Sequence, residues 1–286
     1  MHHFHNEVGK HKENEICTER DMKKTYYYKD ELRDDFAKTG GRIHTKPLRE
    51  KYRYVHRNPL WRTIEFVLYR IIVQPIIFLY VKIAHGQRFR GRRAFKAARA
   101  SGAYLYSNHT GYLLDAFCPN LACWHKHNYI VVGPDAMSIP GLNNIVEMVG
   151  AIPIGSSITQ TREMVKCIQY REKHRGMVTI FPEAHIWPYY TDIRPFPDNS
   201  FRFPAMDGNP VYALTNCYTK RAFFRRPRVI SYIDGPFYAD PALTSRENQK
   251  KLRDRCYEAM KKRTAENSDY EYARYVRAED GDCRGA

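Results

Sequence analysis

A histidine followed by an aspartate after an apolar run is the feature of this sequence most suited to chemistry. The segment from Ser107 to Asp115 contains His109 and comes directly after the apolar residues 103–106. An imidazole can take a proton from a hydroxyl, and a carboxylate beside it can fix its tautomer and stabilise the imidazolium. Two residues six positions apart on an ideal helix are separated by about 240° around its axis, so they do not face each other. His109 must therefore lie in the loop before the helix if it is to meet Asp115. The alternative is Asn108 as a helix N-cap beside a solvated histidine.

Three further segments place small or polar residues at the end of apolar runs. Residues 150–157 are an apolar run that ends in glycine and serines, whose backbone N–H groups could face an anion at the next helix start. Glu183 closes the run 177–182, and residues 209–214 begin a strand with proline at an allowed position. Each segment alone is also compatible with an ordinary strand exit.

The elements that position these residues alternate between strands and helices. This alternation predicts an α/β domain with a largely parallel sheet flanked by helices. In such sheets, functional side chains gather where the strands end. The predicted strands are Ala103–Ser107, Tyr129–Val132, Met177–Phe181, Pro210–Leu214 and Val229–Ile233, and the predicted helices are Gly111–His125, Leu142–Val149, Thr161–His174 and Arg246–Arg263.

The stretch from Trp61 to Ala84 is the most apolar part of the chain. Its core, Ile71 to Val81, is too short to span a bilayer, which takes roughly 20 apolar residues. We therefore expect an N-terminal helical segment that lies in a membrane interface and kinks at Pro75. A buried core helix is the alternative.

The formal net charge of +16 is concentrated in two runs that contain no acid. One follows the apolar stretch directly, so we expect it to contact anionic lipid or the phosphates of a ligand. Binding to nucleic acid is the alternative for so basic a chain, but no helix-turn-helix, zinc or ribonucleoprotein-type motif is present. The cations singled out for lipid or phosphate contact are Arg88, Arg90, Arg92, Arg93, Arg225, Arg226 and Arg228.

The cysteines indicate a reducing compartment. There are seven, an odd number, and no two are spaced as CxxC, which favours free thiols over a disulfide frame or structural zinc. No apolar signal segment follows the start, so we expect the cytoplasmic face of a membrane with peripheral or monotopic attachment. His2, His3 and His5 could bind a metal, although a solvated tail is the simpler interpretation.

In this order, the four segments resemble the motif pattern of the 1-acylglycerol-3-phosphate O-acyltransferase family. The resemblance covers roughly residues 60–262 and divides the chain into a polar arm (1–60), a membrane-interface segment with its basic run (61–100), an acyltransferase domain (101–264) and a tail (265–286). It implies acyl transfer from acyl-CoA or acyl carrier protein to a lysolipid hydroxyl, without a tightly bound cofactor or metal. No nucleic acid is expected as a partner.

The resemblance also implies roles for individual residues. His109 would be the general base, and Asp115 would orient it and stabilise its charge. The residues expected to contact substrate are Asn108, Ile152, Pro153, Ile154, Ser156, Pro182, Glu183 and Arg194.

The sequence departs from the family pattern at three places. Five residues separate His109 from Asp115, where the family usually has four. Ser156 stands near the place of an arginine that grips the acceptor phosphate, and Ala184 follows Glu183 where glycine is usual. Either Arg162, Arg194 or Arg202 replaces the missing cation, or the acceptor is not a simple lysophosphatidate. A catalytically silent membrane protein of the same fold and, more remotely, a metal-dependent hydrolase using His109, Asp115, Glu183 and His185 are the other interpretations.

Overall fold

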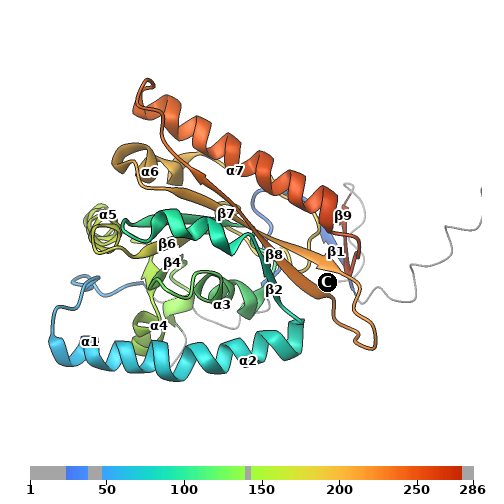
Figure 1. Ribbon diagram of the computed structural model, residues 1–286, viewed down its shortest axis with the longest axis horizontal. Coiled ribbons are helices and arrows are strands. Elements are labelled where there is room, and N and C mark those ends of the chain that lie inside the picture. The colour runs from blue at the N-terminus through green and yellow to red at the C-terminus, as the bar shows by residue number, and fades with distance from the viewer. Residues whose placement is uncertain (1–23, 38–46, 139–142, 279–286) are drawn as a thin grey trace, which may run out of the picture.

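The computed structural model describes residues 24–37, 47–138 and 143–278, and a seven-stranded sheet forms its centre (Figure 1). The strand order is β2-β8-β7-β3-β6-β4-β5. The five strands from β7 to β5 are parallel, whereas β8 runs antiparallel to β7 and β2 follows β8. The predicted largely parallel α/β fold is confirmed. The strands are β2 (Arg88–Arg90), β3 (Ala103–Ser107), β4 (Asn128–Val132), β5 (Ala151–Pro153), β6 (Met177–Ile180), β7 (Val211–Thr219) and β8 (Arg228–Phe237).

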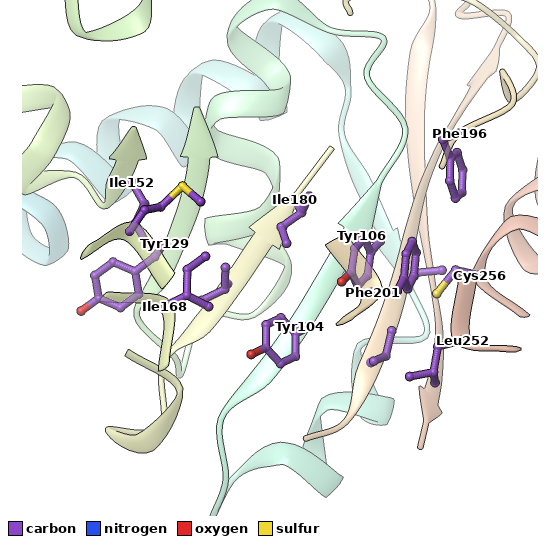
Figure 2. Close-up of a cluster of buried hydrophobic side chains, with 14 of the residues drawn as sticks. Tyr104, Tyr106, Tyr129, Ile152, Ile168, Ile180, Phe196, Phe201, Leu252 and Cys256 are labelled. Carbon is purple, nitrogen blue, oxygen red and sulfur yellow. The ribbon is translucent and has the colours of Figure 1, made fainter. Parts of the chain in front are cut away.

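Helices cover both faces of this sheet because alternate residues of each strand point to opposite sides. Along β3, Tyr104 and Tyr106 pack in one core cluster, whereas Leu105 packs in the other. In Figure 2, Tyr106 lies against Phe201, with ring centroids 3.8 Å apart. The helices are α3 (Tyr112–Ala122), α4 (Asn143–Met148), α5 (Ile158–Lys173), α6 (Arg202–Asp207) and α7 (Ser245–Asn267), with short 3₁₀ turns at η2 (Arg92–Ala98), η3 (Ala136–Ser138) and η4 (Asn199–Phe201).

The apolar segment forms one continuous helix of 27 residues, Pro59–His85, along one side of the domain (Figure 1). It comprises α1 (Pro59–Phe66), a π-helical stretch η1 (Val67–Val73) and α2 (Gln74–His85). The helix continues through Pro75, where a kink was expected, and the π-helical stretch lies just before the proline. In this stretch, Gln74 N–H donates to the Tyr69 carbonyl. The wider turn puts Tyr69 and Gln74, five positions apart, on the same buried face.

The opposite face of this helix is apolar and exposed. By length and composition the whole helix, unlike its core Ile71–Val81 alone, is long and apolar enough to cross a membrane. Only 22% of its most apolar window is buried. The exposed stripe keeps helical spacing of three or four on both sides of η1 and consists of Leu60, Ile64, Val67, Ile71, Ile72, Ile76, Leu79 and Ile83.

The described parts of the arm and the tail form a second, two-stranded sheet. Strand β1 (Lys24–Tyr28) pairs in parallel with β9 (Ala273–Arg277). Neither strand was predicted, because their residues lie at opposite ends of the sequence and show no sustained period. The interpretation of residues 265–286 as a simple tail is therefore wrong for β9. His2, His3 and His5 lie outside the described residues.

Candidate active site

His109 and Asp115 meet at the carboxyl end of β3, as the loop geometry required. His109 lies in the extended segment between β3 and α3, and Asp115 lies in the first turn of α3. The Nδ1 atom of His109 is 2.8 Å from Oδ2 of Asp115. The imidazole also stacks on the Phe181 ring, with centroids 4.5 Å apart. The extra residue between histidine and aspartate is therefore accommodated without loss of the hydrogen bond.

The Asp115 carboxylate is held by more than the histidine. Oδ2 also accepts a hydrogen bond from Gly111 N–H at 2.8 Å, and Oδ1 accepts one from Asn216 Nδ2 at 3.4 Å. Burial raises the pKa of Asp115, and the contacts with His109 and Gly111 oppose that rise. The positive end of the helix dipole also favours the charged carboxylate. Nδ1 of His109 is thus fixed, while Nε2 has no hydrogen-bond partner among the described residues and the side chain keeps 18% exposure.

Glu183 holds the backbone of the histidine. Oε2 accepts the His109 N–H at 2.9 Å, and Oε1 accepts the Arg194 N–H at 3.0 Å. The Arg194 guanidinium lies 3.4 Å from Oε2, and both side chains are completely buried. Burial raises the pKa of Glu183, and Arg194 is the main opposing influence.

This pairing corrects two sequence-based expectations. Arg194 was expected to contact substrate, but its guanidinium is buried against Glu183, Trp187 and the carbonyls of Glu31 and His185. Glu183 was expected to place the acceptor, but its carboxylate oxygens are occupied inside the protein. Both side chains therefore support the His109 loop from inside the protein. Of the other arginines considered, Arg162 and Arg202 are exposed on α5 and α6.

Asn108 also supports the loop. Its Oδ1 accepts the Asn216 N–H at 2.8 Å, and its Nδ2 donates to the Asn216 carbonyl at 3.1 Å. This exchange continues the β3–β7 ladder one residue beyond Ser107. The expected substrate contact of Asn108 is therefore replaced by a structural one, since the side chain is fully buried.

The second motif lies at the same end of the sheet but further across it. Strand β5 stands three positions from β3, and neighbouring strands are about 4.8 Å apart. Ile152 and Pro153 are buried, whereas Ile154 and Ser156 are exposed after the strand ends. Pro182 is buried beside Glu183. The sheet thus places Ile154 and Ser156 roughly 14 Å across from the histidine strand.

The two basic runs both lie near the carboxyl end of α2. Arg88 and Arg90 are exposed on the edge strand β2 and, with Arg92, line a cavity of about 410 Å³ beside α2. Arg92 also binds the carbonyls of Leu121 and Ala122, and Arg93 is exposed. Arg225 and Arg226 are exposed in the β7–β8 hairpin, and Arg228 begins β8.

A group of aromatic residues that the sequence did not reveal holds the loop after Glu183. The backbone N–H of Trp187 donates to the His109 carbonyl at 3.0 Å, and the Trp187 indole stacks on the ring of Tyr275 in β9. Tyr28 of β1 and Phe36 also contact the indole. The run of three tyrosines at positions 26–28 was the available signal, but it could not identify a partner strand near the other terminus. Arm and tail together thus brace the histidine loop.

The described residues contain no group of three or more His, Cys, Asp or Glu side chains that could hold a metal ion. His185 points to Asp35, 3.6 Å from Nδ1, rather than joining His109 and Asp115.

A comparison with protein families bears on residues 88–215, a little under half of the chain. These residues match the family model described as Acyltransferase. The match includes His109, Asp115 and Glu183. The match confirms the resemblance that the four segments show.

A solved structure with a similar fold is the 1-acyl-sn-glycerophosphate (LPA) acyltransferase PlsC from Thermotoga maritima. The two structures share a TM-score of 0.50 at 14% sequence identity, over 74% of this chain and 85% of that chain. At this identity, the likeness concerns the fold. A comparison with curated protein sequences gives no match.

Proposed function

We propose that this protein transfers an acyl group from acyl-CoA or acyl carrier protein to a hydroxyl of a lysophospholipid-type acceptor. The observation that carries the proposal is the 2.8 Å contact between His109 Nδ1 and Asp115, which leaves Nε2 without a partner in the described structure. This pair lies within residues 88–215, the part that matches the acyltransferase family.

The geometry supports general-base catalysis by His109. Nε2 takes the proton of the acceptor hydroxyl, the oxygen attacks the thioester carbonyl, and a C–O bond forms. The C–S bond then breaks, and the imidazolium returns the proton to the departing thiolate. Asp115 stabilises the imidazolium during this cycle. This acyl-transfer reaction requires no metal, redox partner or covalent enzyme intermediate.

We further propose that the reaction takes place at an anionic membrane surface on the cytoplasmic side. The exposed apolar stripe of Pro59–His85 supports this location. An amphipathic helix with one apolar face open and the other packed on the domain suits monotopic attachment. The cations of β2 adjoin its end, where they would meet anionic headgroups.

The β7–β8 hairpin supports the same orientation. Phe223 and Phe224 are exposed near its tip, beside Arg225 and Arg226. Arg221 donates to the carbonyl of Ile83 at 3.0 Å, which ties the hairpin to the end of α2. Exposed aromatics next to arginines are typical of a membrane interface.

The test is release of free thiol from acyl-CoA or acyl carrier protein in the presence of a panel of lysolipids. We expect His109→Ala to lower the rate about 10²- to 10⁴-fold. An alanine variant with full activity would refute the assignment of the base.

A catalytically silent protein of the same fold is the second candidate. The burial of Arg194 favours this candidate, because Arg194 was one of the arginines expected to bind the acceptor phosphate and its guanidinium is not accessible. Absence of both transfer and slow thioester hydrolysis in the wild-type protein, with every donor and acceptor of the panel, would favour this candidate.

A further inference from the structure

A second hollow lies at the amino ends of β4 and β6, away from His109. Its volume is about 730 Å³, within the usual size of a ligand pocket. It is bounded by α1, by the end of α5, and by the residues just before β4 and β6. His109 and Asp115 lie at the carboxyl ends of the parallel strands, so this hollow does not belong to the candidate active site.

The lining of this hollow is strongly cationic. Its cations are Arg62, Arg99, Lys126, Arg171 and Arg175. None of the five forms an ion pair with a carboxylate in the described part of the chain. Lys126 is held by the carbonyls of Ser101 and Arg175, so backbone dipoles fix its charge in place without neutralising it.

Histidines and one acid complete the wall. His127 stacks between Tyr69 and Tyr129, and its Nε2 has no hydrogen-bond partner among the described residues. Glu65 is the single lining carboxylate among these residues and lies 3.7 Å from His127 Nε2. Burial raises the pKa of Glu65, and Arg171 and Arg62 oppose that rise. Five cations against one carboxylate leave the lining positive, which favours an anion.

The hollow opens beside the apolar helix face. Phe66 lines it and is 58% exposed, and the neighbouring Ile64 and Leu60 belong to the exposed stripe. A phosphate held by Arg62 and Arg175 would thus have an apolar surface next to it. That arrangement matches a molecule with an anionic head and acyl chains better than a free anion.

We propose that this hollow binds the phosphate headgroup of an anionic membrane lipid, whose chains lie along the exposed stripe of α1. The inference rests on the membrane location proposed above but not on acyl transfer. Its consequence is that the domain is held on the membrane at a point remote from His109, with the amino end of the sheet next to the lipid surface.

The test compares binding of the full chain to phosphatidylcholine vesicles with and without phosphatidate. Arg62→Gln/Arg175→Gln removes two exposed pocket cations, and Lys250→Gln/Lys262→Gln removes two exposed cations from α7 as a charge-matched control. We expect the pocket variant to bind phosphatidate vesicles about tenfold more weakly than wild type, with unchanged binding to neutral vesicles. The control should retain most of the wild-type affinity.

Equal losses in both variants would reduce the effect to general surface charge and overturn the proposal, as would an unaffected pocket variant. Titration of the wild type with inorganic phosphate and with a soluble short-chain phosphatidate distinguishes the source of the phosphate. Tighter binding of the lipid supports the headgroup, whereas equal affinities would identify a site for free phosphate and refute the lipid assignment. Acyl transfer to a soluble lysolipid, measured in parallel, reports separately on the proposed function.

Discussion

Two buried glutamates flank strand β6, and their surroundings are opposite. Glu183, after the strand, accepts two backbone N–H groups and pairs with Arg194. Glu172, before the strand, has no hydrogen-bond partner for either oxygen among the described residues. Burial raises the pKa of Glu172 to about 10, with Asp207 adding to the rise and Lys126 opposing it.

The difference shows how each end of the sheet uses charge. At the carboxyl end, buried charges are matched within the chain, and the match fixes the backbone of His109. At the amino end, the buried acid is neutral at pH 7, so it cannot compensate the cations of the nearby hollow. The carboxyl end of the sheet has a fixed geometry suited to catalysis, and the amino end has a positive potential suited to binding an anionic ligand.

The largest expected effect comes from the third buried acid, Asp115, at the carboxyl end. Asp115→Asn should lower the acyl-transfer rate about 10²- to 10⁴-fold, because an amide cannot stabilise the imidazolium and can hold the wrong tautomer. Initial rates of thiol release measure this. Asp192→Asn, which changes a half-exposed carboxylate paired with Lys261, should leave the rate near wild type. Full activity of Asp115→Asn would show that the contact is structural only.

The sequence predicted the central sheet well because its signals are local. Apolar runs between predicted helices identified β3, β4, β6, β7 and β8, and helix geometry placed His109 in the loop before α3. The helix predicted over Arg246–Arg263 corresponds to α7. What the sequence could not predict were contacts between distant segments.

Arg194 illustrates that limit. The sequence predicts a substrate contact for Arg194 because nothing in its neighbourhood along the chain indicates burial. In the fold, Glu183, Trp187 and the arm residue Glu31 enclose it. The β1–β9 pairing is a second example, since it joins segments from opposite ends of the chain. The hollow at the amino end is a third, because α1, α5, the end of η2 and the segments before β4 and β6 each contribute a single cation to it.

Removing one partner of the Glu183–Arg194 ion pair should destabilise the fold. Glu183→Gln leaves the Arg194 guanidinium buried without a counter-charge, which typically costs about 3–5 kcal/mol of unfolding free energy. Urea unfolding at neutral pH measures this loss. Adding Arg194→Met in the same chain should recover part of it, because the lone buried charge is then gone. If Glu183→Gln unfolds like the wild type, the ion pair does not support the loop.

At the amino end of β6, the corresponding substitution Glu172→Gln should raise the free energy of unfolding instead of lowering it. An unfolded glutamate releases its proton near pH 4.5, whereas folded Glu172 keeps it until about pH 10. Between these values the native state binds more protons, so stability falls as pH rises. Glu172→Gln removes that dependence and should raise the unfolding free energy by about 1–3 kcal/mol near pH 7 to 8, with less gain near pH 5. Urea unfolding across this range measures the slope of the unfolding free energy against pH. Glu163→Gln, at an exposed position on the same helix, should keep the wild-type slope. Parallel curves for Glu172→Gln and wild type would mean that Glu172 is charged in the folded protein, and the contrast between the two ends of the sheet would then lose its electrostatic basis.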